Sequence, residues 1–322
     1  AYGHGADALV PALDHADGCA VARLAEAVAL RRAGWGGRVV VLGGARTPGE
    51  LQRAADLGAD LVVHTQEQVA MLTSARLAAP VEVWLKLDTG MHRLGFDAHG
   101  FSTARDALNR CDAVAGAVRL MTHLACADER GSAHTQGQLD AFAGAVDGVT
   151  GERSVANSAG VLAWPDSHGD WVRPGLMLYG VSPFAGESAA SLGLTPVMTL
   201  ESRLIAVKTV PAGGAVGYGA TWTATAPTRL GIVAVGYGDG YPWRLGTGGA
   251  PGAAVLIDGQ RCPLVGRVSM DMVAVSLEGC PGARRGDPVV LWGEGLPVEE
   301  VAAWAGTIPY ELLCGIASRV PR

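Results

Sequence analysis

The sequence predicts a two-part α/β protein, with a (β/α)8 TIM-type barrel over residues 1–190 and a mostly-β domain over residues 191–322. Two observations support this prediction. Between residues 17 and 179, short apolar runs of strand length alternate with helical patterns, which is typical of βα units around a parallel sheet. After about residue 195, short β-branched runs alternate with glycine turns, and this pattern indicates a compact β domain.

The βα units follow one another closely in the first part. Helices are expected over 20–32, 48–55, 66–77, 103–109 and 135–146. Strands are expected over 38–42, 60–64, 81–88, 116–123, 154–157 and 176–179. So many units favour a barrel over an open doubly wound sheet. Because a closed barrel of this type has eight strands, we expect at least one strand to precede Ala1.

The second part reads as a set of short strands. They are expected over 202–210, 229–235, 253–257, 272–276 and 288–291, with one helix near 298–305. Asp258-Gly259 is a strong signal for a two-residue hairpin turn. The segment 182–194 is rich in Ser, Ala and Gly and is the expected linker between the two parts.

Composition restricts the class of protein. The chain has 322 residues, 49% of them hydrophobic, and a formal net charge of −6, which argues against nucleic acid as a partner. Its apolar runs are too short for a membrane span, and its first residues lack the basic and apolar regions of a signal peptide. The six cysteines are far apart and show no zinc-ligand spacing, so we expect reduced thiols, no metal site and a cytoplasmic protein.

Polar and glycine residues gather where the predicted strands end. They are Asp88-Thr-Gly, Thr122-His123, Asn157-Ser158 and Arg173-Pro-Gly175. In a βα barrel these positions form the carboxyl-terminal face, where active sites lie. Each has a plain structural interpretation by itself. Ser158 before a helix suggests an N-cap, and an isolated His123 is more often structural than catalytic.

The order of several short strings along the chain changes that interpretation. From the amino terminus they read AYGHG (1–5), KLDTGMHRLGF (86–96), THLACADE (122–129), ANSAG (156–160), RPGLMLYG (173–180), VGYGAT (216–221), GYGDG (236–240), GRVSMD (266–271) and PYE (309–311). Together they resemble the alanine racemase family over nearly the whole chain. The resemblance implies a barrel with a C-terminal β domain, the cofactor pyridoxal 5′-phosphate, and interconversion of L-alanine and D-alanine.

The resemblance also implies which residues hold the cofactor. The cofactor-binding residues would be Tyr2, Asn157, Ser158, Gly175, Leu176 and Tyr310, most of them around the phosphate. A loop before a helix, with hydroxyl groups beside it, is a physically sensible anion site. Arg173 would face the pyridine nitrogen. A guanidinium can only donate there, so the nitrogen stays unprotonated and the ring withdraws electrons less fully, which suppresses side reactions.

Other residues would act on the substrate or on the cofactor ring. His123 would lie against the ring face and hold Arg173, and Arg93 would reach the ring's phenolic oxygen and the substrate carboxylate. Lys86 matches the family's carbamylated lysine, a modification that turns a cation into an anion able to orient Arg93. Without modification it would be an ordinary lysine paired with a carboxylate.

Inversion at Cα needs a base on each face of the planar intermediate. The resemblance makes Tyr218 the base for L-alanine, and the cofactor lysine, expected three residues before Ala1, the base for D-alanine. A phenol is a weak base unless neighbours lower its pKa, and His123 backed by Arg173 is the candidate neighbour. In this family Tyr218, Met270 and Asp271 come from the other subunit, which implies a homodimer with composite active sites.

The resemblance places Asp128, Tyr237 and Arg267 on the path by which substrate enters. Trp243 stands where the family commonly has Arg, so either Arg244 takes that role or the path is less cationic.

Two other functions compete with racemisation of alanine. One is another pyridoxal enzyme of this fold, such as a broad-specificity racemase or a basic amino acid decarboxylase. The other is a non-catalytic cofactor-binding protein, against which the β domain argues. Biosynthesis of D-alanine for peptidoglycan and catabolism of alanine both remain open.

Overall fold

The structure is a computed structural model that describes residues 2, 4–246 and 252–321. Contacts divide the chain into two compact units. The first unit comprises the described residues up to Gly175, and the second comprises Tyr2 together with the described residues from Leu176 onward. Ala1 and Gly3 of the predicted opening motif lie outside the described residues. No helix in the described part of the chain is both long and apolar enough to span a membrane.

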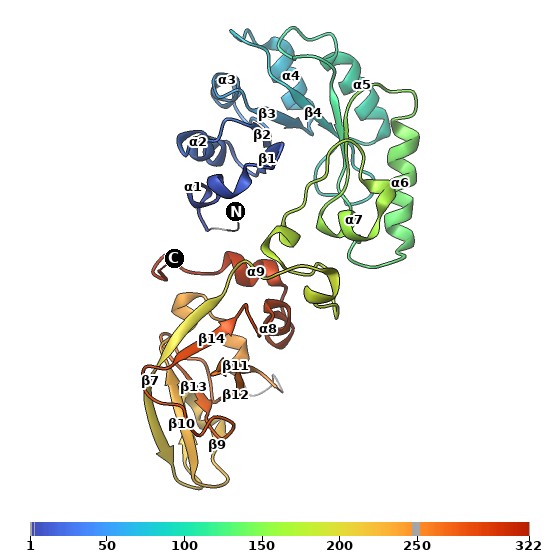
Figure 1. The fold of residues 1–322 in the computed structure, drawn as a ribbon. Coiled ribbons are helices and arrows are strands. Elements are labelled where there is room, and N and C mark those ends of the chain that lie inside the picture. The colour runs from blue at the N-terminus through green and yellow to red at the C-terminus, as the bar shows by residue number, and fades with distance from the viewer. Residues whose placement is uncertain (1, 3, 247–251, 322) are drawn as a thin grey trace. The chain divides into compact units, whose positions relative to one another are not determined.

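The first unit is a parallel sheet with its strands in chain order, from β1 to β6 (Figure 1). The strands are β1 Gly18–Val21, β2 Arg38–Val41, β3 Asp60–Val63, β4 Val83–Lys86, β5 Arg119–Met121 and β6 Arg153–Ser154. The helices are α1 Ala6–Leu9, α2 Leu24–Arg32, α3 Pro48–Asp56, α4 Gln66–Ser74, α5 Ala98–Leu108, α6 Ala133–Ala145 and α7 Ser158–Ala163. This sheet is a parallel half-barrel, which confirms the predicted βα fold class.

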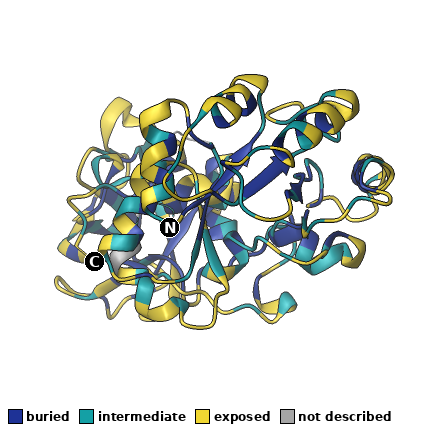
Figure 2. Cartoon of the chain, turned by 90° about the horizontal axis from the view of Figure 1, so that it is seen from above, coloured by how far each residue is buried: buried dark blue, intermediate teal, exposed yellow. Residues whose placement is uncertain are grey.

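Local sequence explains where several of these helices begin. Thr47, Thr65 and Asp97 each precede a helix and accept a hydrogen bond from the backbone N–H three residues ahead. Between the helices, the strands are short apolar runs, and β2 to β4 are almost fully buried. Figure 2 shows strands in dark blue and helices with exposed yellow outer faces.

Two predicted elements of the first part are wrong. The sequence 20–32 was predicted as one helix, but its first residues end the edge strand β1, and α2 starts only at Leu24. The run 176–179 was predicted as a strand, but Leu176–Tyr179 is a 3-10 turn, closed by the Gly180 N–H donating to the Met177 carbonyl at 3.0 Å. Both are short apolar runs, for which periodicity does not separate strand from helix.

The amino-terminal ends of the strands carry paired charges. Arg38 at the start of β2 forms an ion pair of 2.5 Å with Asp60 at the start of β3. Arg119 at the start of β5 forms ion pairs with Glu82 and Glu152 on either side of it. The Trp84 indole donates to the Asp60 carboxylate at 2.9 Å. Acidic and basic groups therefore compensate one another along this edge.

The second unit contains a closed antiparallel barrel with the strand order β10-β13-β12-β11-β14-β7. Its strands are β7 Leu200–Val210, β10 Thr228–Val233, β11 Ala254–Ile257, β12 Gln260–Val265, β13 Val273–Ser276 and β14 Pro288–Trp292, and β8 Ala215–Val216 pairs with β9 Trp222–Thr223 outside it. The predicted helix is confirmed as α8 Val298–Ala305. A further helix, α9 Pro309–Cys314, follows it and was not predicted.

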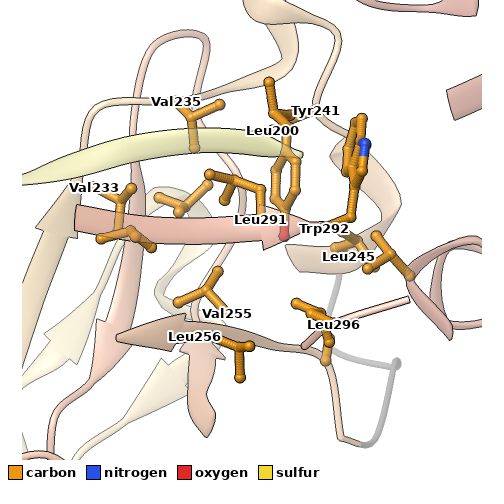
Figure 3. Packing of buried hydrophobic residues seen from close by; sticks show 14 of the residues in the cluster. Leu200, Val233, Val235, Tyr241, Leu245, Val255, Leu256, Leu291, Trp292 and Leu296 are labelled. Atoms are coloured by element: carbon orange, nitrogen blue, oxygen red, sulfur yellow. The ribbon is translucent and has the colours of Figure 1, made fainter. Parts of the chain in front are cut away.

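The predicted hairpin turn is also confirmed. Asp258 and Gly259 both have positive φ (50° and 71°) and connect β11 to β12, with Ile257 opposite Gln260. The core of the second unit is formed by barrel strands together with α8, α9 and the segment that contains Tyr241 and Leu245 (Figure 3). In this core the buried rings of Tyr241 and Trp292 stack with centroids 6.1 Å apart, and Val255 of β11 and Leu291 of β14 belong to the same cluster.

Candidate active site

In the first unit the predicted site residues follow the carboxyl ends of neighbouring strands. Lys86 is the last residue of β4, His123 lies two residues after β5, and Ser158 begins the helix after β6. Because parallel strands end at one edge, the sheet brings these side chains together where a βα fold places its active site. Arg173 Nη2 lies 3.1 Å from His123 Nδ1, and the charges of Arg173, Lys86 and Arg93 all act on the pKa of His123.

Arg173 is the most connected of these side chains. Its Nη1 donates to Ser154 Oγ at 2.6 Å, and its Nη2 lies 2.7 Å from the Thr122 carbonyl and 3.1 Å from that of Val155. Nη2 also lies 3.1 Å from His123 Nδ1. All four acceptors are uncharged, and burial lowers the pKa of Arg173 to about 10. The guanidinium is thus held in place as a cation without a carboxylate among these contacts.

The contact with Arg173 determines the state of the His123 ring. A guanidinium has only donors, so Nδ1 must carry a lone pair and the ring proton is on Nε2. Burial, followed by the charges of Arg173, Lys86 and Arg93, lowers the pKa of His123 to about 3. His123 is therefore a neutral imidazole with one N–H to offer, over a wide range of pH.

Lys86 lies close to other cations. Burial lowers the pKa of its amine to about 8, and the charges of Arg173 and Arg93 act in the same direction, while Asp88 opposes them. Together Lys86, Arg93 and Arg173 form a positive cluster that the nearby carboxylate of Asp88 offsets in part. Such a cluster favours an anionic ligand or an anionic modification.

Arg93 lies on an ordered loop between β4 and α5. The Asp88 carboxylate accepts hydrogen bonds from the backbone N–H groups of Gly90 and His92, both at 3.0 Å. The loop closes through a bond from Phe96 N–H to the Lys86 carbonyl at 2.9 Å. Just before that closure Gly95 has a φ of +128°, where a Cβ would lie 2.7 Å from the Asp88 nitrogen. This position requires glycine.

The turn before α7 contains the first unit's phosphate-site candidates. Asn157 caps α7 by accepting a hydrogen bond from Gly160 N–H at 2.9 Å, and Ser158 is 3% exposed. The Gly175 N–H donates to Ser158 Oγ at 2.9 Å, so the two segments that carry these residues meet. Backbone N–H groups and a hydroxyl at a helix start, next to a positive cluster, fit a phosphorylated cofactor.

The remaining phosphate-site candidates lie in the second unit. The Tyr2 ring packs edge-on against Tyr179 and Tyr310, with centroids 4.8 Å and 5.9 Å apart. Burial raises the pKa of Tyr2, so its phenol stays protonated and available as a donor. Tyr310 is the second residue of α9, and Leu176 is buried at the start of the 3-10 turn.

Tyr218, the predicted base, begins a 3-10 turn, Tyr218–Ala220, in the second unit. Its side chain is 71% exposed. The guanidinium of Arg267 lies beside this turn, 3.3 Å from where a Cβ on Gly219 would be. Met270 is also exposed, at 54%. A single chain therefore presents both side chains to its surroundings.

Arg319 is a site-organising residue that the sequence did not predict. It donates to Asp271 at 2.6 Å and to Asp239 at 2.8 Å. Asp271 belongs to the predicted substrate site, and Asp239 follows Tyr237 of the predicted access path. Tyr237 N–H donates to the Ser269 carbonyl at 3.1 Å, so the two loops are also joined through their backbones. Arg319 is close to these two acidic residues in space but far from both along the chain, so no sequence motif joins the three.

Other predicted access-path residues are placed on surfaces. Asp128 is exposed in the loop after β5 of the first unit. Trp243 and Arg244 lie on a 3-10 turn, Trp243–Gly246, of the second unit, and the Trp243 side chain is 49% exposed. The structure thus arranges the predicted residues as two groups, one in each unit.

Known proteins resemble this chain along its entire length. The model of the alanine racemase N-terminal domain matches residues 1–183, and that of the C-terminal domain matches residues 197–322. An alanine racemase of Nitrosococcus oceani is 52% identical over 322 residues, which cover 100% of this chain and 89% of the relative. One of Stutzerimonas stutzeri is 51% identical, with the same coverage.

Solved structures are similar as well. The crystal structure of the biosynthetic alanine racemase from Pseudomonas aeruginosa superposes with a TM-score of 0.94 at 49% identity, covering 100% of this chain and 88% of that one. The alanine racemase from Acinetobacter baumannii gives a TM-score of 0.90 at 37% identity, covering 99% and 88%.

Proposed function

Because the chain belongs to the alanine racemase family and is an isomerase that interconverts L-alanine and D-alanine, we propose that it works by a two-base mechanism with pyridoxal 5′-phosphate. The observation that supports this best is the positive cluster of Lys86, Arg93 and Arg173 at the carboxyl edge of the sheet. Gly175 follows Arg173 of this cluster by two residues, and its N–H donates to Ser158 Oγ at 2.9 Å. A phosphorylated aromatic aldehyde suits that set of donors.

Each part of the cofactor would meet its own group of residues. Tyr2, Ser158, Gly175, Leu176 and Tyr310 would hold the phosphate, with Asn157 shaping the turn through its cap on α7. Arg173 would donate to the ring nitrogen, and His123 would stack on the ring. When bound, the cofactor supplies a conjugated ring that accepts the electron pair left at Cα. Because Arg173 cannot give up its proton readily, that acceptor stays weak and side reactions are limited.

Lys86 would carry the carbamate that orients Arg93. The neutral amine adds to the carbon of CO2, an N–C bond forms, and one proton leaves to solvent. A pKa of about 8 means that a substantial part of the amine is neutral near physiological pH. The product is an anion next to the guanidinium of Arg93, which could then face both the substrate carboxylate and the ring oxygen.

Tyr218 would remove the Cα proton of L-alanine, and the cofactor lysine that the family places before Ala1 would remove that of D-alanine. Tyr218, Met270 and Asp271 would enter the site of a partner subunit, making a homodimer with composite sites. The exposure of Tyr218 and Met270 in the single chain supports this arrangement. The neutral His123, with its proton on Nε2, could donate to the Tyr218 oxygen and so increase its acidity.

In the cell we propose a cytoplasmic enzyme that supplies D-alanine for peptidoglycan or takes part in alanine catabolism. The test of activity uses the full-length protein, including the cofactor lysine, with added pyridoxal 5′-phosphate. We expect L-alanine and D-alanine, incubated separately, to approach the same mixture of enantiomers, followed by optical rotation. If neither enantiomer is converted by the protein with bound cofactor, the proposed mechanism is wrong.

A further inference from the structure

Gln138 of α6 is a buried polar residue that no role described above explains. It is 1% exposed, and its amide bonds to two loops at the carboxyl edge of the sheet. Its Nε2 donates to the His123 carbonyl at 3.0 Å and to Thr89 Oγ1 at 3.2 Å. Its Oε1 accepts from the Ala125 N–H at 2.8 Å. Since a carbonyl needs a donor and an N–H needs an acceptor, these partners fix the amide's orientation.

These bonds lie directly beside the His123–Arg173 contact. Gln138 bonds to the backbone on both sides of Leu124, so it holds the segment that carries the His123 ring in one conformation. Thr89 Oγ1 lies 2.8 Å from Thr122 Oγ1, and the Thr122 carbonyl accepts from Arg173 Nη2 at 2.7 Å. Three hydrogen bonds therefore link Gln138 to Arg173 through Thr89 and Thr122, and the Thr122 residue itself joins its hydroxyl to its carbonyl.

We propose that Gln138 is a positioning residue of the racemase reaction, which holds His123 in register with Arg173 by clamping the loop after β5 to the loop after β4. This proposal rests on the proposed function, because it assigns His123 a place at the reacting ring. Gln138 itself would touch neither substrate nor cofactor.

The chemistry of the site argues that an amide is needed here. A buried apolar residue would serve helix packing equally well, but would leave the His123 carbonyl and the Ala125 N–H without these partners. A carboxylate would accept from Ala125 N–H, yet it would place an oxygen against the His123 carbonyl. Only a side chain of this length with both a donor and an acceptor satisfies the two loops together.

The experiment compares two glutamines of the same helix in the full-length holoenzyme. Gln138→Met keeps volume and removes all three hydrogen bonds. Gln136→Met is the matched control, because Gln136 is exposed and its side-chain amide donates to Asp140 within the same helix. Three quantities are measured well below the unfolding temperature: kcat, KM for both enantiomers, and hydrogen exchange of the segment 122–127 by mass spectrometry.

We expect Gln138→Met to lower kcat on the order of 10- to 100-fold in both directions, because displacing a reacting group by an ångström has effects of this size. KM should change less than about threefold, since Asp88 holds the Arg93 loop independently. Exchange in 122–127 should be faster, because the Ala125 N–H has lost its acceptor. Gln136→Met should match the unchanged protein in all three quantities.

A kcat within about twofold of the unchanged protein, or slower turnover without faster exchange in 122–127, overturns the proposal. A Gln138→Met variant that is less stable but keeps the full kcat also overturns it. If Gln138→Met does not fold, Gln138→Glu is measured for kcat and KM alone. This variant retains the acceptor for the Ala125 N–H and loses the donor to the His123 carbonyl, so kcat should fall while KM changes little, and an unchanged kcat overturns the proposal. The proposed function is tested separately: if the unchanged holoenzyme does not racemise alanine, that function fails, while the exchange measurement still tests the clamp.

Discussion

Arg173 Nη2 lies 3.1 Å from His123 Nδ1, and this contact puts the imidazole proton on Nε2. It also keeps the ring neutral, because a second proton on Nδ1 would face a cation. Burial and the neighbouring charges lower the pKa of His123 from 6.5 to about 3.

The first prediction concerns stability in acid. Between about pH 3 and pH 6.5, the unfolded chain binds a proton at His123 that the folded chain does not, so the free energy of unfolding falls as pH falls through this window. In urea unfolding, the free energy of unfolding of the unchanged protein should decrease between about pH 7 and pH 4. In His123→Gln this decrease should be smaller by on the order of 3 kcal/mol. His99→Gln, at an exposed position of α5, is the control. Equal pH dependence in His123→Gln and the unchanged protein would contradict the buried neutral ring.

The second prediction concerns Lys86. Its pKa of about 8 leaves enough neutral amine for reaction with CO2. Protein equilibrated with 13C-bicarbonate at about pH 8 should show one carbamate carbon resonance by NMR. Lys86→Arg should lose it, while Lys208→Arg, which changes the exposed second lysine of this sequence, should keep it. A resonance that survives in Lys86→Arg would assign the modification elsewhere.

The third prediction separates the two bases. Tyr218→Phe removes the phenolic oxygen but keeps the ring, so cofactor affinity should change little. Turnover of L-alanine should fall on the order of 10² to 10⁴-fold, the usual contribution of a general base. The rate at which deuterium from solvent enters L-alanine should fall with it. Unchanged turnover would exclude Tyr218 as a base.

The fourth prediction tests the composite site. Tyr218→Phe and Arg173→Ala chains, each inactive alone, are co-expressed and mixed dimers are isolated with two affinity tags. If Tyr218 acts in the partner's site, one of the two sites in a mixed dimer has both residues intact, and about half the activity of the unchanged dimer returns. If Tyr218 acts in its own chain, every site lacks one residue. No recovery would then be seen.

The fifth prediction concerns the loop that carries Arg93. Gly95→Ala places a Cβ 2.7 Å from the Asp88 nitrogen at a φ of +128°, so the loop must open. The variant should lose on the order of 1 to 3 kcal/mol in urea unfolding and bind alanine more weakly. Gly137→Ala in α6 meets nothing within 4 Å, and should instead be neutral or slightly stabilising. Two similar results would mean that the Gly95 backbone is not constrained.

Sequence patterns predicted most of the fold because the strands of the first unit are buried and lie between clear helical periods. They failed where an element was short. Gly18–Val21 is a four-residue edge strand that runs into α2, and its apolar residues were counted with the helix. Leu176–Tyr179 is as apolar as a strand, but it forms a 3-10 turn. The domain boundary between residues 190 and 191 stays a prediction.

Sequence motifs indicate those site residues that lie close together along the chain. Lys86 and Arg93 belong to one string, so they were identified together. Gln138 was not identified, because a single glutamine on a helix belongs to no sequence motif. Its role becomes visible only when its hydrogen-bond partners in two loops are known. Arg319 was missed for the same reason, since Asp239 and Asp271 are far from it along the chain. Hydrogen bonds between residues far apart in the chain depend on the fold, so the spacing of neighbouring residues in the sequence does not predict them.

The half-barrel sheet has two ends that can be engineered by different rules. At the amino-terminal end, Arg38 and Arg119 form ion pairs with Asp60, Glu82 and Glu152, whereas the opposite end keeps an excess of positive charge. In directed evolution for heat resistance, substitutions around these ion pairs can therefore be screened for thermal stability alone. Every change at the other end must also be screened for turnover.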